Sequence, residues 1–188
     1  MSLLYAGPTL STKILSASFM NLFFDRNISD NAALYLINKS PTHSIPRNRL
    51  WLMLYFADRE FLIRHQLPLT TDGYSKQPEG YVPVNLSNSL FLKLIVSGIG
   101  NDAAYSVLDG KLANLDFLSN AKTDCLDEIY SLLEYVPSLV INDLSHGSAW
   151  VYAKMNEYIN VFDIINEYGL THELPMSANE IFYLYNFG

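Results

Sequence analysis

Histidine and cysteine are the side chains best suited to acid–base, nucleophilic or metal chemistry near neutral pH. This chain has few of them: His43, His65, His146, His172 and the single Cys125. No histidine has a ligand partner at the spacing of a His-Glu-x-x-His motif, and there is no Cys-x-x-Cys pair, phosphate loop or Gly-x-Ser-x-Gly elbow. A site assembled from distant residues would not show in such spacings. The sequence therefore predicts a protein that is not an enzyme and that uses no metal and no cofactor.

A second chemical signal is the charged triplet Asp58-Arg59-Glu60, which interrupts an apolar stretch. On a helix, consecutive side chains point about 100° apart, so the three charges sweep roughly 200° of its circumference. At least one of them must then face protein, and a buried charge needs a partner. We expect an internal ion pair or a cap on a neighbouring loop. The alternative is a polar contact within a binding surface.

The triplet lies in the strongest helical segment of the chain. Pro46 can open this helix, because proline is tolerated at the first helical position. Residues 50–57 form a run of eight consecutive apolar residues. Leu52 and Leu54 point to nearly opposite faces, so the helix is apolar around most of its girth. The pattern predicts a central, buried helix from about residue 46 to residue 64.

Four further helices are expected from cap residues and from apolar residues recurring at helical spacing. They are a first helix capped by Ser29 or Asp30, a helix from about 85 to 95, a helix from about 119 to 136, and a last helix from about 157 to 168. Short extended segments are expected around Leu69 and Tyr74, beside turn residues.

The clearest strand signal covers residues 104–117. Asp109-Gly110 lies between two apolar segments there, and Asp-Gly supplies the positive φ angles that a two-residue hairpin needs. We therefore expect a β-hairpin packed beside the central helix. The predicted fold class is α+β and mostly helical, with several helices around a central apolar helix and a small antiparallel β-sheet or hairpin.

Length and composition indicate one folded domain. The chain has 188 residues, of which 49% are hydrophobic and 16% charged, and this excludes a disordered chain. One cysteine cannot form an internal bridge, which excludes a disulfide-built secreted domain and makes the cytoplasm the default compartment. The apolar stretch at 14–24 is too short to cross a bilayer, so we expect no membrane-spanning segment.

Charge is distributed unevenly along the chain. Residues 1–94 contain nine lysines and arginines against six acidic residues, whereas residues 95–188 contain three against thirteen. An acidic surface repels phosphate backbones, so we do not expect nucleic-acid binding, and a basic protein partner fits better. The alternative is a solvated acidic face that only aids solubility.

Several segments resemble the SocA-like Panacea antitoxin domain family, which has phage-associated members. The most specific part is LWLMLYFADREFL at residues 50–62, followed by a Pro-hydrophobic-Thr turn at 68–70. Residues 31–37 resemble the family's first helix, and residues 144–150 resemble its Ser/Thr-His and Ala-Trp segment. The resemblance covers roughly residues 28–175.

The resemblance implies a single domain over residues 28–188, preceded by an N-terminal extension over 1–27. It implies a cytoplasmic protein that neutralises a protein toxin encoded by an adjacent gene, as an antitoxin or as an adaptor that carries the toxin to a protease. It implies no catalytic residues. The alternatives are a phage-associated interaction or structural protein, or a small hydrolase with a site that is not visible in the sequence. The motif residues, with structural or partner-binding roles, are Tyr55, Asp58, Arg59, Gly80, His146 and Trp150.

For His146 and Trp150 there are two interpretations. We expect a packed aromatic pair whose histidine is satisfied by a hydrogen bond. The alternative is a hot spot for a partner protein.

Overall fold

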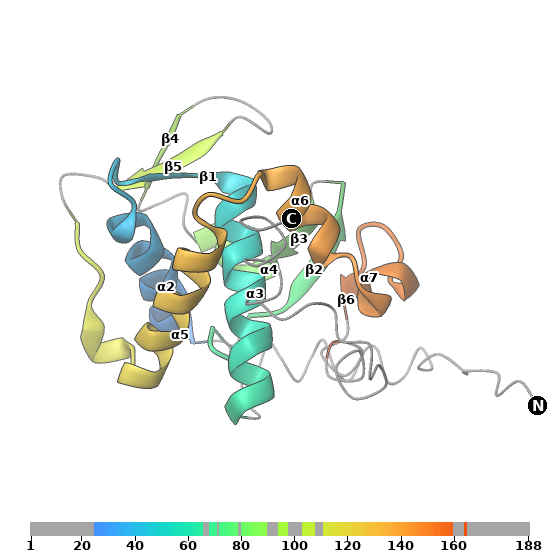
Figure 1. Cartoon of the computed structure of the whole chain (residues 1–188), viewed down its shortest axis with the longest axis horizontal. Helices are drawn as coiled ribbons and strands as arrows, with labels where there is room; N and C mark the ends of the chain where they lie inside the picture. The colour runs from blue at the N-terminus through green and yellow to red at the C-terminus, as the bar shows by residue number, and fades with distance from the viewer. Residues whose placement is uncertain are drawn as a thin grey trace, which may run out of the picture.

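The structure is a computed structural model and describes residues 25–65, 68–70, 72–78, 80–89, 94–97, 103–107, 111–159 and 164. It is an α+β fold, mostly helical, with small antiparallel sheets (Figure 1). Its elements are α2 (Arg26–Lys39), β1 (Ser44–Pro46), α3 (Arg47–His65), β2 (Tyr74–Gln77), β3 (Gly80–Pro83), α4 (Val84–Ser89), β4 (Leu94–Ser97), β5 (Ala104–Val107), the 3-10 turn η3 (Leu115–Phe117), α5 (Asn120–Leu133), α6 (Ser138–Ser145), α7 (Ser148–Tyr152) and β6 (Tyr158–Ile159).

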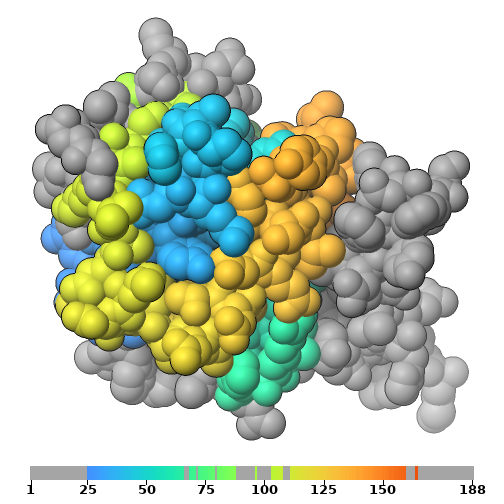
Figure 2. Space-filling model, turned by 60° about the vertical axis from the view of Figure 1, so that its left-hand side comes forward, coloured from blue at the N-terminus to red at the C-terminus, as the bar shows by residue number. Residues whose placement is uncertain are grey.

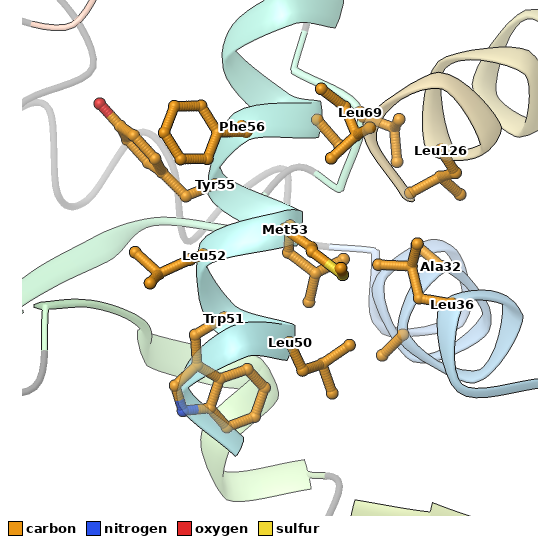
Figure 3. Packing of buried hydrophobic residues seen from close by; sticks show 14 of the residues in the cluster. Ala32, Leu36, Leu50, Trp51, Leu52, Met53, Tyr55, Phe56, Leu69 and Leu126 are labelled. Carbon is orange, nitrogen blue, oxygen red and sulfur yellow. The ribbon is translucent and has the colours of Figure 1, made fainter. Parts of the chain in front are cut away.

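Helix α3 is the centre of the core, as its apolar run predicts. Every side chain from residue 50 to residue 59 is buried. Leu50 and Met53 point toward Ala32 and Leu36 of α2, while Leu52 points the opposite way (Figure 3). The helix packs on α2 and α5 on one side and on β3 and α6 on the other. A helix enclosed in this way needs apolar residues on all its faces, which explains the absence of a polar stripe.

Two three-stranded antiparallel sheets flank this helix, in the orders β1-β5-β4 and β3-β2-β6. In the first, Ile45 pairs with Tyr105. In the second, Tyr74 pairs with Pro83 on one side and with Ile159 on the other. Segments distant in the sequence therefore meet in both sheets. On another face of the molecule, α2 and β1 lie beside the segment from 111 to 145 (Figure 2).

The hairpin predicted over 104–117 is wrong. Residues 104–107 pair with β1 and β4, whereas residues 111–117 contain no strand. The backbone N–H groups of Ala113 and Asn114 donate instead to the side chains of Asn38 and Asn31 on α2, at 2.9 and 2.7 Å. These amides on α2 take the hydrogen bonds that a partner strand would need. Asp109-Gly110 itself lies outside the described residues.

Two predicted helices are also corrected. The segment 85–95 divides into α4, which ends at Ser89, and strand β4, which pairs with β5. The segment from 157 begins as strand β6, because the free edge of β2 pairs with it at Tyr74 and Ser75. Ile164 is helical and buried, and most of the rest of that predicted helix lies outside the described residues.

Two other helices follow their local signals more closely. Helix α5 begins directly after Ser119, and its periodic residues Leu126, Ile129 and Leu133 are buried. Helix α2 begins earlier than expected, because Asp25 is its N-cap and accepts hydrogen bonds from the N–H groups of residues 27 and 28. Ser29 and Asp30, the expected caps, are buried inside the helix.

Candidate partner-binding site

Asp58 is the buried charge that the triplet predicts, and it is satisfied by a neighbouring loop. Its carboxylate accepts hydrogen bonds from the Thr70 backbone N–H at 2.6 Å, the Thr70 hydroxyl at 2.5 Å and the Tyr74 hydroxyl at 2.6 Å. Burial raises the pKa of Asp58 to about 6, although these hydrogen bonds oppose the shift. The interpretation of a cap on a neighbouring loop is therefore confirmed for Asp58.

The loop that Asp58 caps is held from three other elements. The Ser29 hydroxyl on α2 donates to the Thr70 carbonyl, and Lys122 on α5 donates to the Leu69 carbonyl at 2.7 Å. Asp72 accepts from the Leu86 backbone N–H at 2.8 Å at the start of α4. Burial also raises the pKa of Asp72. Through these contacts the buried carboxylates of Asp58 and Asp72 link α3 and α4 to the loop between α3 and β2.

Arg59 has a different environment from Asp58. Its guanidinium lies 4.7 Å from the centre of the Phe56 ring and 3.5 Å from the Glu60 carboxylate, and the side chain is 8% exposed. Its Nε has no hydrogen-bond partner among the described residues. Arg59 is therefore separate from the other motif residues and packs along α3.

Three of the remaining motif residues, Tyr55, Trp150 and His146, belong to one continuous chain of aromatic rings that starts at Tyr74, beside Asp58. Tyr74 meets Tyr55 edge-on, and Tyr55 stacks on Tyr81 with ring centres 3.8 Å apart. Tyr81 then contacts Trp150 at 5.1 Å. Stacked and edge-on aromatic pairs each contribute about 0.5–1.5 kcal/mol beyond the area they bury. The chain of rings links α3 to β2, β3 and α7.

Gly80 allows β3 to approach α6 in this region. Its φ of 113° is one that residues with a Cβ rarely adopt. A Cβ placed here would lie 2.6 Å from Oδ1 of Asn142. The role of Gly80 is therefore close backbone packing beside the aromatic chain.

His146 and Trp150 form the outer end of the chain of rings. Their rings stack with centres 4.1 Å apart and planes 11° from parallel, which confirms the packed aromatic pair. Nε2 of His146 is buried and has no hydrogen-bond partner in the described part of the chain, so the expectation of a satisfied histidine is wrong for this atom. Burial also lowers the pKa of His146. Among the described residues, the indole of Trp150 stacks on this imidazole and covers one of its faces.

Lys76 fixes the same end of the structure. Its ammonium lies 4.8 Å from the centre of the Trp150 ring and donates to the carbonyls of Trp150 at 2.7 Å and Ala153 at 3.1 Å. These carbonyls belong to the end of α7, where a cation also suits the helix dipole. Sequence reasoning did not identify Lys76 or Tyr81, because neither belongs to a motif and only the pairing of β2 with β3 places them here.

Directly beyond Trp150, apolar side chains lie on the surface. Val151, Tyr152, Met155 and Tyr158 are 65%, 64%, 48% and 40% exposed, and we call these four residues the α7–β6 patch. The patch adjoins the motif residues, since it follows Trp150 in the chain and Tyr158 lies over Gly73. The four residues lie within eight positions of one another in the chain. Clusters of exposed apolar side chains mark interaction sites on soluble proteins.

Other chemistry is limited within the described residues. They contain no group of three or more His, Cys, Asp and Glu side chains that could hold a metal ion. Cys125 is buried, and burial raises the pKa of its thiol to about 12. None of the described helices is both long and apolar enough to cross a membrane.

Comparison of the chain with protein-family models, with curated proteins and with solved structures finds no match. The arrangement of the site therefore provides the basis for a functional proposal, together with the sequence motifs that it unites.

Proposed function

We propose that this chain is a binding module that neutralises a protein toxin, as an antitoxin or as an adaptor that carries the toxin to a protease. The observation that carries the proposal is the α7–β6 patch. It exposes two tyrosines, a methionine and a valine between residues 151 and 158. Tyrosine and methionine are enriched in protein interfaces, because they bury large areas with few rotatable bonds or adapt to irregular surfaces.

The patch is held in place before any partner arrives. Lys76 binds the end of α7, and the backbone N–H of Asn156 donates to the Lys76 carbonyl at 2.8 Å. Tyr158 belongs to β6, which pairs with β2. Because the surface is ordered in advance, binding would lose less conformational entropy. This supports a role for the motif residues in positioning the binding surface, with Trp150 and His146 as its support.

Two features of the sequence point to the kind of partner. The resemblance at residues 50–62 is to an antitoxin family, and the acidic second half of the chain suits a basic protein. This chain would bind the toxin in the cytoplasm of the cell that makes both proteins. Action would be stoichiometric, through contact alone.

The test is coexpression of the chain with the product of each adjacent gene, read out by growth and by copurification. We expect one neighbour to be toxic when expressed alone and to be both bound and neutralised by this chain. If no neighbour is toxic, or if a toxic neighbour is neither bound nor neutralised, the proposed function is wrong.

Variants of the patch test where the toxin binds. Val151→Asp and Met155→Asp place a charge on exposed positions, so they should fold normally and weaken binding by about 2 kcal/mol or more if these residues lie at the centre of the interface. Leu112→Asp is the matched control, because Leu112 is 73% exposed and belongs to the segment 111–117 on the far side of the molecule from α7 (Figure 1). If the native chain binds a toxin and both patch variants bind it equally well, the function stands and the assigned surface is wrong.

A further inference from the structure

A second site lies between the two sheets, at the start of α3. It is a hollow of about 210 Å³ that shares no residue with the α7–β6 patch. Trp51 and Tyr105 are buried and pack against each other, with ring centres 5.2 Å apart. The polar side chains around these rings come from α3, β2 and α4 and are half-buried: Arg47, Asn48, Gln77 and Ser87.

Two polar groups of this hollow have unused hydrogen-bonding capacity. Oδ1 of Asn48 is buried and accepts no hydrogen bond within the described part of the chain. Arg47 forms no ion pair with any described residue and donates no hydrogen bond through its guanidinium to one. A buried acceptor without a donor costs free energy in the folded protein. Both residues line the hollow, so Arg47 could donate hydrogen bonds to a ligand and Asn48 could accept one.

Arg47 has no evident structural reason to occupy its position. It is the first residue of α3, and a positive charge at a helix N-terminus is unfavourable because the unsatisfied N–H groups there are also positive. Among the described residues that line the hollow, Arg47 alone carries a charge. Burial raises the pKa of Tyr105, so this phenol stays neutral and does not repel an anion. The hollow is thus electrostatically suited to a negative group.

We propose that this hollow binds an α-carboxylate together with the N–H group of the same residue, as presented by the C-terminus of a peptide chain or by a free amino acid. The carboxylate would accept hydrogen bonds from the Arg47 guanidinium, whose planar fork matches a carboxylate. The neighbouring N–H would donate to Oδ1 of Asn48, which has almost no exposed surface and would have to turn toward the ligand. The rings of Trp51 and Tyr105 would contact the apolar part of the residue.

The size of the hollow is enough to enclose about one residue of a ligand. A volume of about 210 Å³ lies below the range of roughly 300–1,000 Å³ that is typical of sites for drug-sized ligands. It exceeds the roughly 30 Å³ that one water occupies in the liquid several times over. A nucleotide or an extended peptide is therefore too large to be enclosed, whereas a terminal residue is not. This inference does not depend on the proposed function.

The test uses the indole N–H signal of Trp51 in two-dimensional ¹H–¹⁵N NMR spectra of the full chain. The chain has two tryptophans, and Trp150→Phe identifies which signal belongs to Trp51. The probes are acetyl-Gly-Gly with a free carboxylate, the same peptide with a C-terminal amide, and free glycine, each titrated to a concentration on the order of 10 mM to detect dissociation constants near 1 mM.

We expect a saturable shift of the Trp51 signal with a carboxylate probe and none with the amide. A response to acetyl-Gly-Gly identifies a peptide terminus as the ligand, and a response to glycine alone identifies a free amino acid. Arg47→Gln should weaken binding about tenfold or more while leaving the fold intact, since it removes only the charged donor. Lys154→Gln, at an exposed lysine outside the hollow, is the control for loss of one positive charge and should bind as the native chain does.

Three results would overturn the proposal. These are no shift of the Trp51 signal with either carboxylate probe, equal binding of the amide and the carboxylate, or undiminished binding by the Arg47→Gln variant.

Discussion

At the scale of single residues, Asp58 shows how burial and hydrogen bonding compete. Removal from water disfavours the charged carboxylate more than the hydrogen bonds from Thr70 and Tyr74 favour it, so its pKa rises from 3.8 to about 6. The folded protein therefore holds a proton on Asp58 in a pH range where the unfolded chain has lost it. The stability of the domain must depend on pH in that range.

The first prediction follows from this shift. Between about pH 3.8 and pH 6 the folded state binds more protons than the unfolded state, so the contribution of Asp58 to the free energy of unfolding falls as pH rises, by on the order of 1–3 kcal/mol in total. Asp58→Asn does not titrate and lacks this contribution. Urea unfolding of both proteins at several pH values measures the difference between them. A difference that stays constant, or that grows with pH in favour of the native chain, would contradict the raised pKa.

The second prediction concerns Gly80. Gly80→Ala should lower the free energy of unfolding by about 1–3 kcal/mol, because the positive φ is strained for alanine and the new Cβ would collide with Asn142. Gly73→Ala is the matched control, since its Cβ would meet the Tyr158 ring at an ordinary 3.6 Å. Thermal melting compares the two variants. Equal melting temperatures would contradict the prediction and would mean that Asn142 moves aside at little cost.

At the scale of elements, α3 organises the fold because other elements surround it. Its N-terminal half contributes Arg47, Asn48 and Trp51 to the hollow, and its C-terminal half carries Asp58 and the Arg64–Glu128 ion pair at 2.6 Å to α5. The half-buried Arg49 joins α3 to the end of α5, where its guanidinium donates to three backbone carbonyls. Two different interactions, apolar packing and carbonyl capping, therefore hold the same pair of helices together.

The third prediction tests the packing of α3. Leu54→Ala should reduce the free energy of unfolding by about 2–5 kcal/mol, because Leu54 is fully buried and its loss leaves a cavity. Leu112→Ala, at an exposed position, should change it by less than about 0.5 kcal/mol. Chemical denaturation of both variants provides the comparison. A loss below about 1 kcal/mol at Leu54 would be inconsistent with a central α3.

The fourth prediction tests the capping by Arg49. Its guanidinium binds the carbonyls of Leu133, Glu134 and Val136 at 2.7–2.8 Å, at the end of α5 and directly beyond it, where backbone carbonyls lack partners within the helix. Arg49→Gln should cost about 2 kcal/mol, and Arg49→Lys somewhat less, because an ammonium can reach only part of this set. Hydrogen exchange should show faster opening of the last turn of α5 in the Gln variant. Unchanged exchange there would mean that water replaces the guanidinium without loss.

At the scale of the whole molecule, the acidic half of the sequence and the exposed apolar patch coincide. The acidic second half of the sequence contains every element from α5 to β6 and therefore the whole α7–β6 patch. The patch would provide short-range contact area, and the charge would act over longer distances. The charge should mainly affect the association rate constant, and the apolar contacts should mainly affect the dissociation rate constant.

The fifth prediction applies to the toxin complex of the proposed function. If association is electrostatically steered, its rate constant should fall clearly between low salt and about 0.15 M salt, where the screening length is about 8 Å. The dissociation rate should change little, because contacts that exclude water are screened less. Stopped-flow mixing at several salt concentrations measures both rates. An association rate independent of salt would leave the acidic half with a role in solubility alone.

The sequence by itself determined what depends on neighbouring residues: the fold class, the buried central helix from the apolar run at 50–57, the start of α5 at Ser119, and the need for a partner at Asp58. Only the tertiary structure decided which strands pair, because strand pairing joins segments far apart in the chain and depends on what else competes for their hydrogen bonds. Where a hairpin was expected, the backbone binds the side chains of Asn31 and Asn38, and where a helix was expected, Tyr158 pairs with the edge of β2. The aromatic chain to Trp150 and the hollow at Arg47 depend on that pairing, since each unites residues from several elements that no local pattern connects.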